Sequence, residues 1–187
     1  MIFYLSDYKL CQGAFSVVMI DIDSKIAYKL FKSYNHPDLN GTCKEEIGED
    51  KTNEYRKKVF KTEIKAYDLV QKSSLLKAYT PKYYGVITAD KVFDKDNDVT
   101  YQYLTNCCYK MEFIDGCENK LYGLSEMINL LEPVEKKLKF KLVDIIIEFQ
   151  RYKINYINDA SVIHNDKEFK IIDFGTEDSN NFEPIIE

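Results

Sequence analysis

The residues best suited to chemistry lie near the end of the chain, where the mostly apolar run 170–172 leads into Asp173-Phe174-Gly175. The run predicts a strand that delivers one carboxylate onto a turn, and Gly175 allows the backbone to fold back. A carboxylate in this position is suited to hold Mg²⁺ against the phosphates of a nucleotide. Because three residues recur often by chance, the meaning of this turn depends on its companions upstream.

Two charged residues upstream stand within apolar patterns. Lys29 belongs to an expected strand over 26–31, where alternation puts it on the same face as Ala27. Glu63 shares a helical stripe with four less polar residues, namely Val59, Phe60, Tyr67 and Val70. A buried ammonium and a buried carboxylate each need a partner, so we expect Lys29 and Glu63 to pair. The alternative for each residue is a position that reaches water.

A third feature is the glycine turn within residues 10–18. Small residues at positions 13, 14 and 16 let backbone amides approach a phosphate chain, and Phe15 is placed to close over it. A plain hairpin turn is the alternative interpretation of this segment.

In order along the chain, these segments resemble the motifs of the eukaryotic-type protein kinases. The resemblance runs from about residue 5 to residue 176. It matches the glycine-rich loop, the phosphate-binding lysine, its helix glutamate, the hinge and the metal-binding turn. The matching residues are Gly13 with Phe15, Ala27-Tyr28-Lys29, Glu63, Met111-Glu112-Phe113-Ile114 and Asp173-Phe174-Gly175.

The resemblance implies a site for ATP and Mg²⁺. Lys29, held by Glu63, would contact the α- and β-phosphates, and Asp173 would hold Mg²⁺ bridging the phosphates. Gly13 and Phe15 would cover the phosphates. The adenine would be bound by side chains and hinge backbone groups from Val18, Ala27, Met111, Glu112 and Ile114.

The chain departs from the kinase pattern in three places. The first is Cys11, where the family usually has its first glycine. The second is the catalytic loop: an ungapped correspondence puts Lys153-Ile154-Asn155 in place of the triplet that supplies the base, and Ala160 in place of the metal-binding asparagine. A shorter loop would instead bring Asp159 into the base position, with Ser161 or Asn165 as the second metal ligand. The third is the region after Gly175, where twelve residues leave no room for an activation segment.

These features lead to two main functional hypotheses. The first is a minimal, atypical protein kinase that binds ATP-Mg²⁺ and transfers the γ-phosphate to Ser or Thr of a protein, with Lys29, Glu63 and Asp159 as its catalytic residues. The second is a catalytically impaired pseudokinase, a binding or inhibitory module toward a kinase or another protein. A small-molecule phosphotransferase is a third possibility, which normally needs a larger helical region after the metal turn.

The elements that must position these residues define an α+β, kinase-like fold. An antiparallel-sheet lobe over 1–114 has expected strands at 8–10, 15–23, 26–31, 82–89 and 99–114, one helix at 54–72, a loop at 33–53 and a hairpin loop at 94–98. A truncated, mostly helical lobe over 115–187 has expected helices at 124–132 and 134–152 and short strands near 161–163 and 169–172.

Bulk properties narrow the class of partner. A net charge of −5 without an obviously basic face argues against nucleic-acid binding. No apolar run is long enough to span a bilayer, and the N-terminus lacks the pattern of a signal peptide. The five cysteines lack metal-ligand spacing and are expected to be buried thiols in a reducing compartment. We therefore expect a cytoplasmic protein, in the host cytoplasm if it comes from a virus or is a bacterial effector.

Overall fold

The computed structural model describes residues 1–39, 48–120, 136–155, 160–165 and 169–176. The chain forms two compact units, one of residues 1–61 with 83–113 and the other of residues 62–82 with 114–187. Each unit is a mixture of strands and helices, and most strand pairs are antiparallel. The α+β class is thus confirmed. The lobe boundaries at 114/115 stay a prediction.

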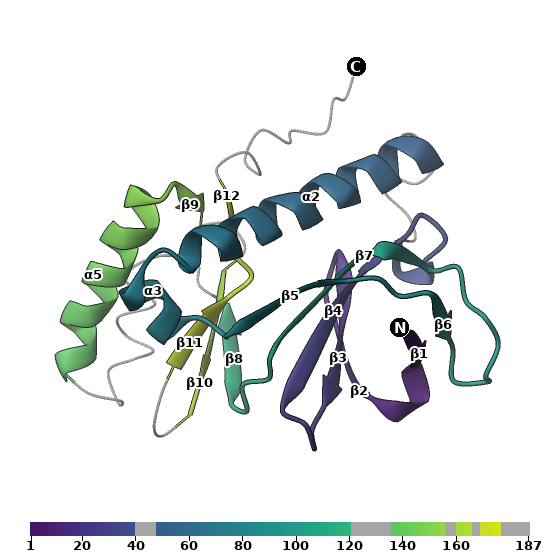
Figure 1. Ribbon diagram of the computed structural model, residues 1–187, viewed down its shortest axis with the longest axis horizontal. Coiled ribbons are helices and arrows are strands. Elements are labelled where there is room, and N and C mark those ends of the chain that lie inside the picture. The colour runs from purple at the N-terminus through teal and green to yellow at the C-terminus, as the bar shows by residue number, and fades with distance from the viewer. Residues whose placement is uncertain (40–47, 121–135, 156–159, 166–168, 177–187) are drawn as a thin grey trace. The chain divides into compact units, whose positions relative to one another are not determined.

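The first unit is built on a five-stranded antiparallel sheet in the order β2-β3-β4-β7-β5 (Figure 1). The strands are β2 (Lys9–Gln12), β3 (Ser16–Asp21), β4 (Ile26–Lys32), β5 (Tyr83–Ile87) and β7 (Tyr103–Glu112). The β3–β4 turn is closed by a hydrogen bond from the Ser24 amide to the Asp21 carboxylate at 3.1 Å. The expected strands of this sheet are confirmed, although β7 begins at residue 103 rather than 99.

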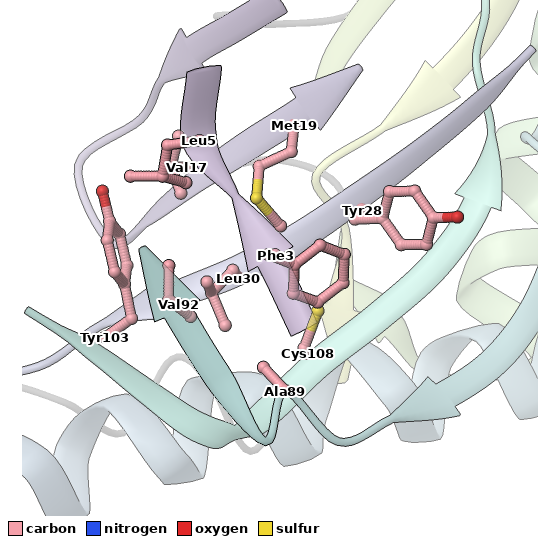
Figure 2. Close-up of a cluster of buried hydrophobic side chains, with 10 residues drawn as sticks. All are labelled: Phe3, Leu5, Val17, Met19, Tyr28, Leu30, Ala89, Val92, Tyr103 and Cys108. Atoms are coloured by element: carbon pink, nitrogen blue, oxygen red, sulfur yellow. The ribbon is translucent and has the colours of Figure 1, made fainter. Parts of the chain in front are cut away.

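One face of this sheet carries a buried apolar cluster. Its sheet members follow the alternation of the strands, as with Val17 and Met19 in β3 and Tyr28 and Leu30 in β4. Figure 2 shows the side chains of the cluster converging, including several from outside the sheet. The full set is Phe3, Leu5, Val17, Met19, Tyr28, Leu30, Ala89, Val92, Tyr103 and Cys108.

A short parallel pair covers this face and is not predicted by the sequence pattern. It joins β1 (Ile2–Tyr4) to β6 (Lys91–Phe93), and it contributes Phe3 and Val92 to the cluster. The hairpin turn expected at 94–98 is confirmed. There the Asp94 carboxylate accepts hydrogen bonds from the amides of Asp96 and Asp98, at 2.9 and 3.0 Å.

Helix α2 (Glu49–Val70) carries the expected apolar stripe but begins five residues before the predicted start at 54. Gly48 precedes it with a φ of +76°, and its carbonyl accepts hydrogen bonds from the Thr52 amide and hydroxyl. Two acidic residues in the first turn, Glu49 and Asp50, favour the helix dipole. Part of the expected loop at 33–53 is therefore helical. A short 3₁₀ helix, η2 (Pro37–Leu39), occupies another part, and residues 40–47 lie outside the described residues.

Helix α2 ends at residue 70 rather than 72 and is followed by α3 (Ser74–Tyr79), which the pattern does not predict. The Ser73 hydroxyl caps α3 by accepting the Leu76 amide at 3.3 Å, which explains the break between the helices. A short 3₁₀ helix, η1 (Leu5–Asp7), follows β1.

The second unit contains a three-stranded antiparallel sheet in the order β11-β10-β8, formed by β8 (Cys117–Lys120), β10 (Ser161–His164) and β11 (Phe169–Ile172). Helix α5 (Lys136–Arg151) confirms the helix expected at 134–152, and its residues Ile145, Ile146 and Phe149 are buried as predicted. Helix α3 belongs to this unit and packs on β11 through a ring contact of Tyr79 with Phe169 and a hydrogen bond from Lys170 to the Ala78 carbonyl.

The second unit is less helical in its described part than the sequence predicts. Besides the three-stranded sheet, β9 (Ile154–Asn155) pairs with β12 (Gly175–Thr176). The strands β8, β9 and β12 have four, two and two residues, too few for a periodic pattern to be recognised. The helix expected at 124–132 lies outside the described residues.

Candidate functional site

The turn that carries Asp173 has a strained backbone. Asp173 has a φ of +56°, in the left-handed region that residues with a Cβ rarely adopt, although Asp tolerates it better than most. Such conformations persist only where the surrounding structure holds them, and they concentrate at functional sites.

Phe174 is the residue that holds this turn in place. Its ring is 2 % exposed and lies between Tyr67 of α2 and Phe149 of α5, with centroid distances of 4.8 and 5.5 Å. Two aromatic contacts of this kind stabilise the turn beyond the area that they bury. The Asp173 turn is therefore anchored on α2 and α5.

Glu63 lies one helical turn before Tyr67 in α2, in the same unit as Asp173. Its side chain is only 9 % exposed, and its stripe neighbours Phe60, Tyr67 and Val70 are buried as well. The alternative that Glu63 sits at the edge of the stripe and reaches water does not fit this burial. A buried carboxylate needs a charged or hydrogen-bonding partner.

Lys29 lies in the first unit, on the face of the sheet opposite the apolar cluster. It is 6 % exposed, and its ammonium is 5.7 Å from the centroid of the Phe31 ring. Phe31 in turn packs edge-on against Phe60 of α2, at 5.5 Å between centroids. The alternative that Lys29 reaches solvent does not fit its burial.

The strand register brings together most of the residues expected around the adenine. Val18 lies directly opposite Lys29, and Ala27 lies directly opposite Met111. Opposite residues of an antiparallel pair share a face, and so do residues two apart, so that all four lie on one face of the sheet. Glu112 pairs with Ile26 at the end of this ladder, whereas Ile114 belongs to the second unit.

The glycine turn is a closed turn between β2 and β3. The Gly13 amide donates to the Ser16 carbonyl at 2.9 Å, and a Cβ at position 13 would lie 3.3 Å from that same oxygen. This close approach explains the glycine. Phe15 does not project freely: its ring packs against Tyr55 and under the guanidinium of Arg56, at 5.7 and 5.0 Å.

Two buried cations at this turn do not belong to any of the sequence motifs. Lys32 is 1 % exposed and donates to the Gly13 carbonyl at 2.6 Å and to the Asp38 carboxylate at 2.9 Å. Arg56 is 4 % exposed and donates to the Ala14 carbonyl at 3.2 Å. In a lysine-rich sequence a cation at a strand end or in a helix is normally solvated, so no sequence signal marks either residue.

The Nδ1 atom of His36 lies 3.7 Å from the Asp38 carboxylate and accepts the hydrogen bond of the Asp38 amide at 3.1 Å. The hydrogen bond from Lys32 is the main cause that lowers the pKa of Asp38.

The region expected to supply a base is described only in part. Asp159 lies outside the described residues. Asn155 in β9 pairs directly with Gly175, and Lys153 just before it has a φ of +54°. The ungapped correspondence, which puts Asn155 in the base position, therefore places that residue beside the Asp173 turn.

The two alternatives for a second metal ligand differ in position. Ser161 pairs with Ile172, the residue before Asp173, and its buried hydroxyl has no hydrogen-bond partner among the described residues. Asn165 follows the far end of β10 and donates to the Asp115 carbonyl at 2.9 Å. Asn165 lies four residues beyond Ser161, which corresponds to about 13 Å along a strand. Because Ser161 is the residue that lies beside the Asp173 turn, Asn165 is too far away to share a metal ion with Asp173.

Asp173 is the one carboxylate on the described part of this turn. Within the described ranges, no group of three or more His, Cys, Asp or Glu side chains is placed to hold a metal ion. A single carboxylate fits a Mg²⁺ ion whose other ligands are phosphate oxygens and water.

The cysteines follow the prediction in part. Cys107 and Cys108 of β7 are buried, as expected, whereas Cys11 of β2 is exposed. Burial raises the pKa of Cys107 to about 11 and that of Cys108 to about 12, so both are neutral thiols at physiological pH.

Comparisons with known proteins do not assign the chain. No protein-family model matches it, and no curated protein matches it. In the part of the chain that the structure describes, no helix is both long and apolar enough to cross a membrane. The likeness to protein kinases remains a prediction that stands on the motifs and on the geometry given above.

Proposed function

We propose that this protein binds ATP with Mg²⁺ and acts as an atypical protein kinase that transfers the γ-phosphate to Ser or Thr of a protein. The observation that carries the proposal is the anchored Asp173 turn. Phe174 packs on Tyr67, one helical turn from the buried Glu63, so one helix supports both acidic residues of the proposed site.

The sheet of the first unit supports the nucleotide part of the proposal. Val18, Ala27 and Met111 lie on the same face of the sheet as Lys29, and their apolar side chains would pack on the adenine. The backbone of Glu112 and Ile114 would bind the adenine edge. Lys29 would contact the phosphates, and Glu63 would hold its ammonium in place.

In phosphoryl transfer, positioning and charge neutralisation carry most of the catalysis. Bound Mg²⁺ would neutralise the charge that develops on the phosphates, and Asp173 would hold it. Asp159 is the residue proposed to orient the attacking hydroxyl group and accept its proton.

One observation favours a second candidate, the pseudokinase. Asn155 lies beside the Asp173 turn through its pairing with Gly175. An amide in the base position cannot accept a proton as a carboxylate does. In that case the chain would use bound nucleotide to stabilise a surface that engages another protein.

Incubation with Mg²⁺ and γ-labelled ATP, alone and with a cell lysate, separates the two candidates. An enzyme transfers label, and both Lys29→Ala and Asp173→Asn abolish transfer; the second variant keeps a side chain that tolerates the positive φ. A pseudokinase shows ATP-dependent thermal stabilisation and no label. The matched controls are Lys9→Ala and Asp68→Asn, at exposed positions of β2 and α2. With neither label nor stabilisation, nucleotide binding itself is disproved.

A further inference from the structure

The carbonyl groups of the glycine turn accept hydrogen bonds from two buried basic residues. The Gly13 carbonyl accepts from the Lys32 ammonium at 2.6 Å, the Ala14 carbonyl from Arg56 Nη1 at 3.2 Å, and the Phe15 carbonyl from the Lys32 amide at 3.0 Å. Three consecutive carbonyls are thus bound by only two residues, Lys32 and Arg56. We call these two residues with Asp38 the turn clamp.

The turn clamp is costly to build, which indicates a role. Removing a cation from water is unfavourable unless hydrogen bonds and opposite charges compensate for it. Lys32 and Arg56 are 1 % and 4 % exposed, and only Lys32 has a carboxylate in the clamp, Asp38 at 2.9 Å. Desolvation lowers the pKa of Arg56, although a guanidinium stays charged at neutral pH. Its Nε has no hydrogen-bond partner among the described residues.

Within the described residues, the carbonyls of this turn are hydrogen-bonded, whereas two of its amides are not. No described group accepts a hydrogen bond from the amides of Ala14 or Phe15. Gly13 and Ala14 are exposed and Phe15 is half-buried. Successive free amides in a turn form a concavity that suits an anion, and the two nearby cations favour negative charge there.

We propose that Lys32 and Arg56 are positioning residues that fix the glycine turn with its carbonyls inward, so that its amides present a preformed site to the phosphates of the nucleotide; this inference rests on the proposed function. A rigid turn loses less conformational entropy on binding than a mobile one. The turn clamp also explains how a turn with Cys11 in place of one glycine remains usable. Neither Lys32 nor Arg56 needs to touch the nucleotide.

Binding of ATP and of adenosine, measured by calorimetry, tests the inference because adenosine lacks the phosphates. We expect Arg56→Gln and Lys32→Met each to weaken ATP binding about 10-fold and to leave adenosine binding unchanged. Arg56→Lys keeps the charge and loses the planar fork, so it should weaken ATP binding less. Lys57→Gln, at the exposed neighbouring position of α2, removes the same charge and should leave both affinities unchanged.

Hydrogen exchange without ligand provides the second readout and covers variants that are too unstable to titrate. The Gly13 and Lys32 amides, which donate to Ser16 and Phe15 carbonyls, should exchange faster in Arg56→Gln than in the native chain or in Lys57→Gln. Exchange in Arg56→Gln at the native rate would overturn the proposed role of the turn clamp but not the proposed function. The same holds if the variants lose affinity for ATP and for adenosine to the same extent. If the native chain binds adenosine but not ATP, or binds neither, the proposed function fails as well.

Discussion

The single residue that explains most about the second unit is Phe174. Its two ring contacts, with Tyr67 and Phe149, join α2 and α5 to the turn that carries Asp173. Asp173 keeps its strained φ because this packing holds the turn in place. Packing and the proposed chemistry therefore depend on adjacent residues.

Replacement of Phe174 by alanine should be severely destabilising. A fully buried ring leaves a cavity, and such changes typically cost about 3–5 kcal/mol. Urea unfolding followed by circular dichroism measures the loss. Ile147→Ala, on the exposed side of α5 at 51 % exposure, is the control and should cost less than about 1 kcal/mol. A loss below that level for Phe174→Ala would mean that the ring is not part of the core.

Asp38 should make stability depend on pH in the acid range. The hydrogen bond and the charge of Lys32 lower the pKa of Asp38 below its ordinary value of 3.8. A lowered pKa contributes stability above the ordinary value, and this contribution is lost as the pH falls through the pKa of the folded state.

Denaturant unfolding of the native chain and of Asp38→Asn, at neutral pH and near pH 3, checks this expectation. The stability difference between the two proteins should shrink in acid, because the carboxylate that distinguishes them becomes protonated. An unchanged difference would show that Asp38 titrates normally and that its pair with Lys32 is absent in solution.

Among the elements, β4 and β7 do the most to arrange the first unit. Their ladder pairs Ala27 with Met111 and Lys29 with Tyr109, and a bulge between Leu30 and Lys32 shifts the register at its end. The bulge lies at Lys32, the residue of the turn clamp that reaches Gly13. Bulges of this kind re-aim side chains near functional positions.

The burial of β7 predicts which thiols react. Cys11 should be alkylated by iodoacetamide in the native protein at neutral pH, because it is exposed on β2. Cys107 and Cys108 should stay unmodified until the protein unfolds, because they are buried and their pKa values are about 11 and 12. Peptide mass spectrometry with and without urea distinguishes the sites. Rapid native labelling of Cys108 would contradict the strand register of β7.

For the molecule as a whole, the open question is whether the proposed site performs transfer or only binding. Helix α2 runs through the boundary of the two units, between Lys61 and Thr62, and carries the buried residues Phe60 and Tyr67 on either side of it. The chemistry beyond binding depends on which residue supplies the base near Asp173.

Asn155→Asp tests whether Asn155 or Asp159 occupies the position of the catalytic base. If Asn155 occupies the base position, the new carboxylate should raise label transfer by about 10²-fold or more over the native chain. Asp159→Asn should then have no effect. If Asp159 is the base instead, Asp159→Asn should lower transfer by a similar factor, and Asn155→Asp should not raise it. Initial rates with γ-labelled ATP and a protein substrate from the lysate provide the measurement.

Local patterns in the amino-acid sequence were sufficient for much of this structure. Alternation identified β3 and β4, the 3.6-residue stripe identified α2 and α5, and the Asp-Phe-Gly turn marked the end of β11. These features depend on residues within a few positions of one another, and hydrophobic periodicity encodes them directly. The same patterns indicated that Lys29 and Glu63 lie among apolar residues, and both are buried.

Contacts between distant parts of the chain decided the rest. The β1–β6 pair joins residues 2–4 to 91–93, and the β9–β12 pair joins 154–155 to 175–176. Lys32 is buried because the Gly13 carbonyl, 19 positions earlier, lies within hydrogen-bond distance, and Arg56 because the Ala14 carbonyl does, 42 positions away. No local pattern specifies such partners. Burial of a charge is favourable only when hydrogen bonds and opposite charges compensate for lost hydration, and folding alone brings these groups together.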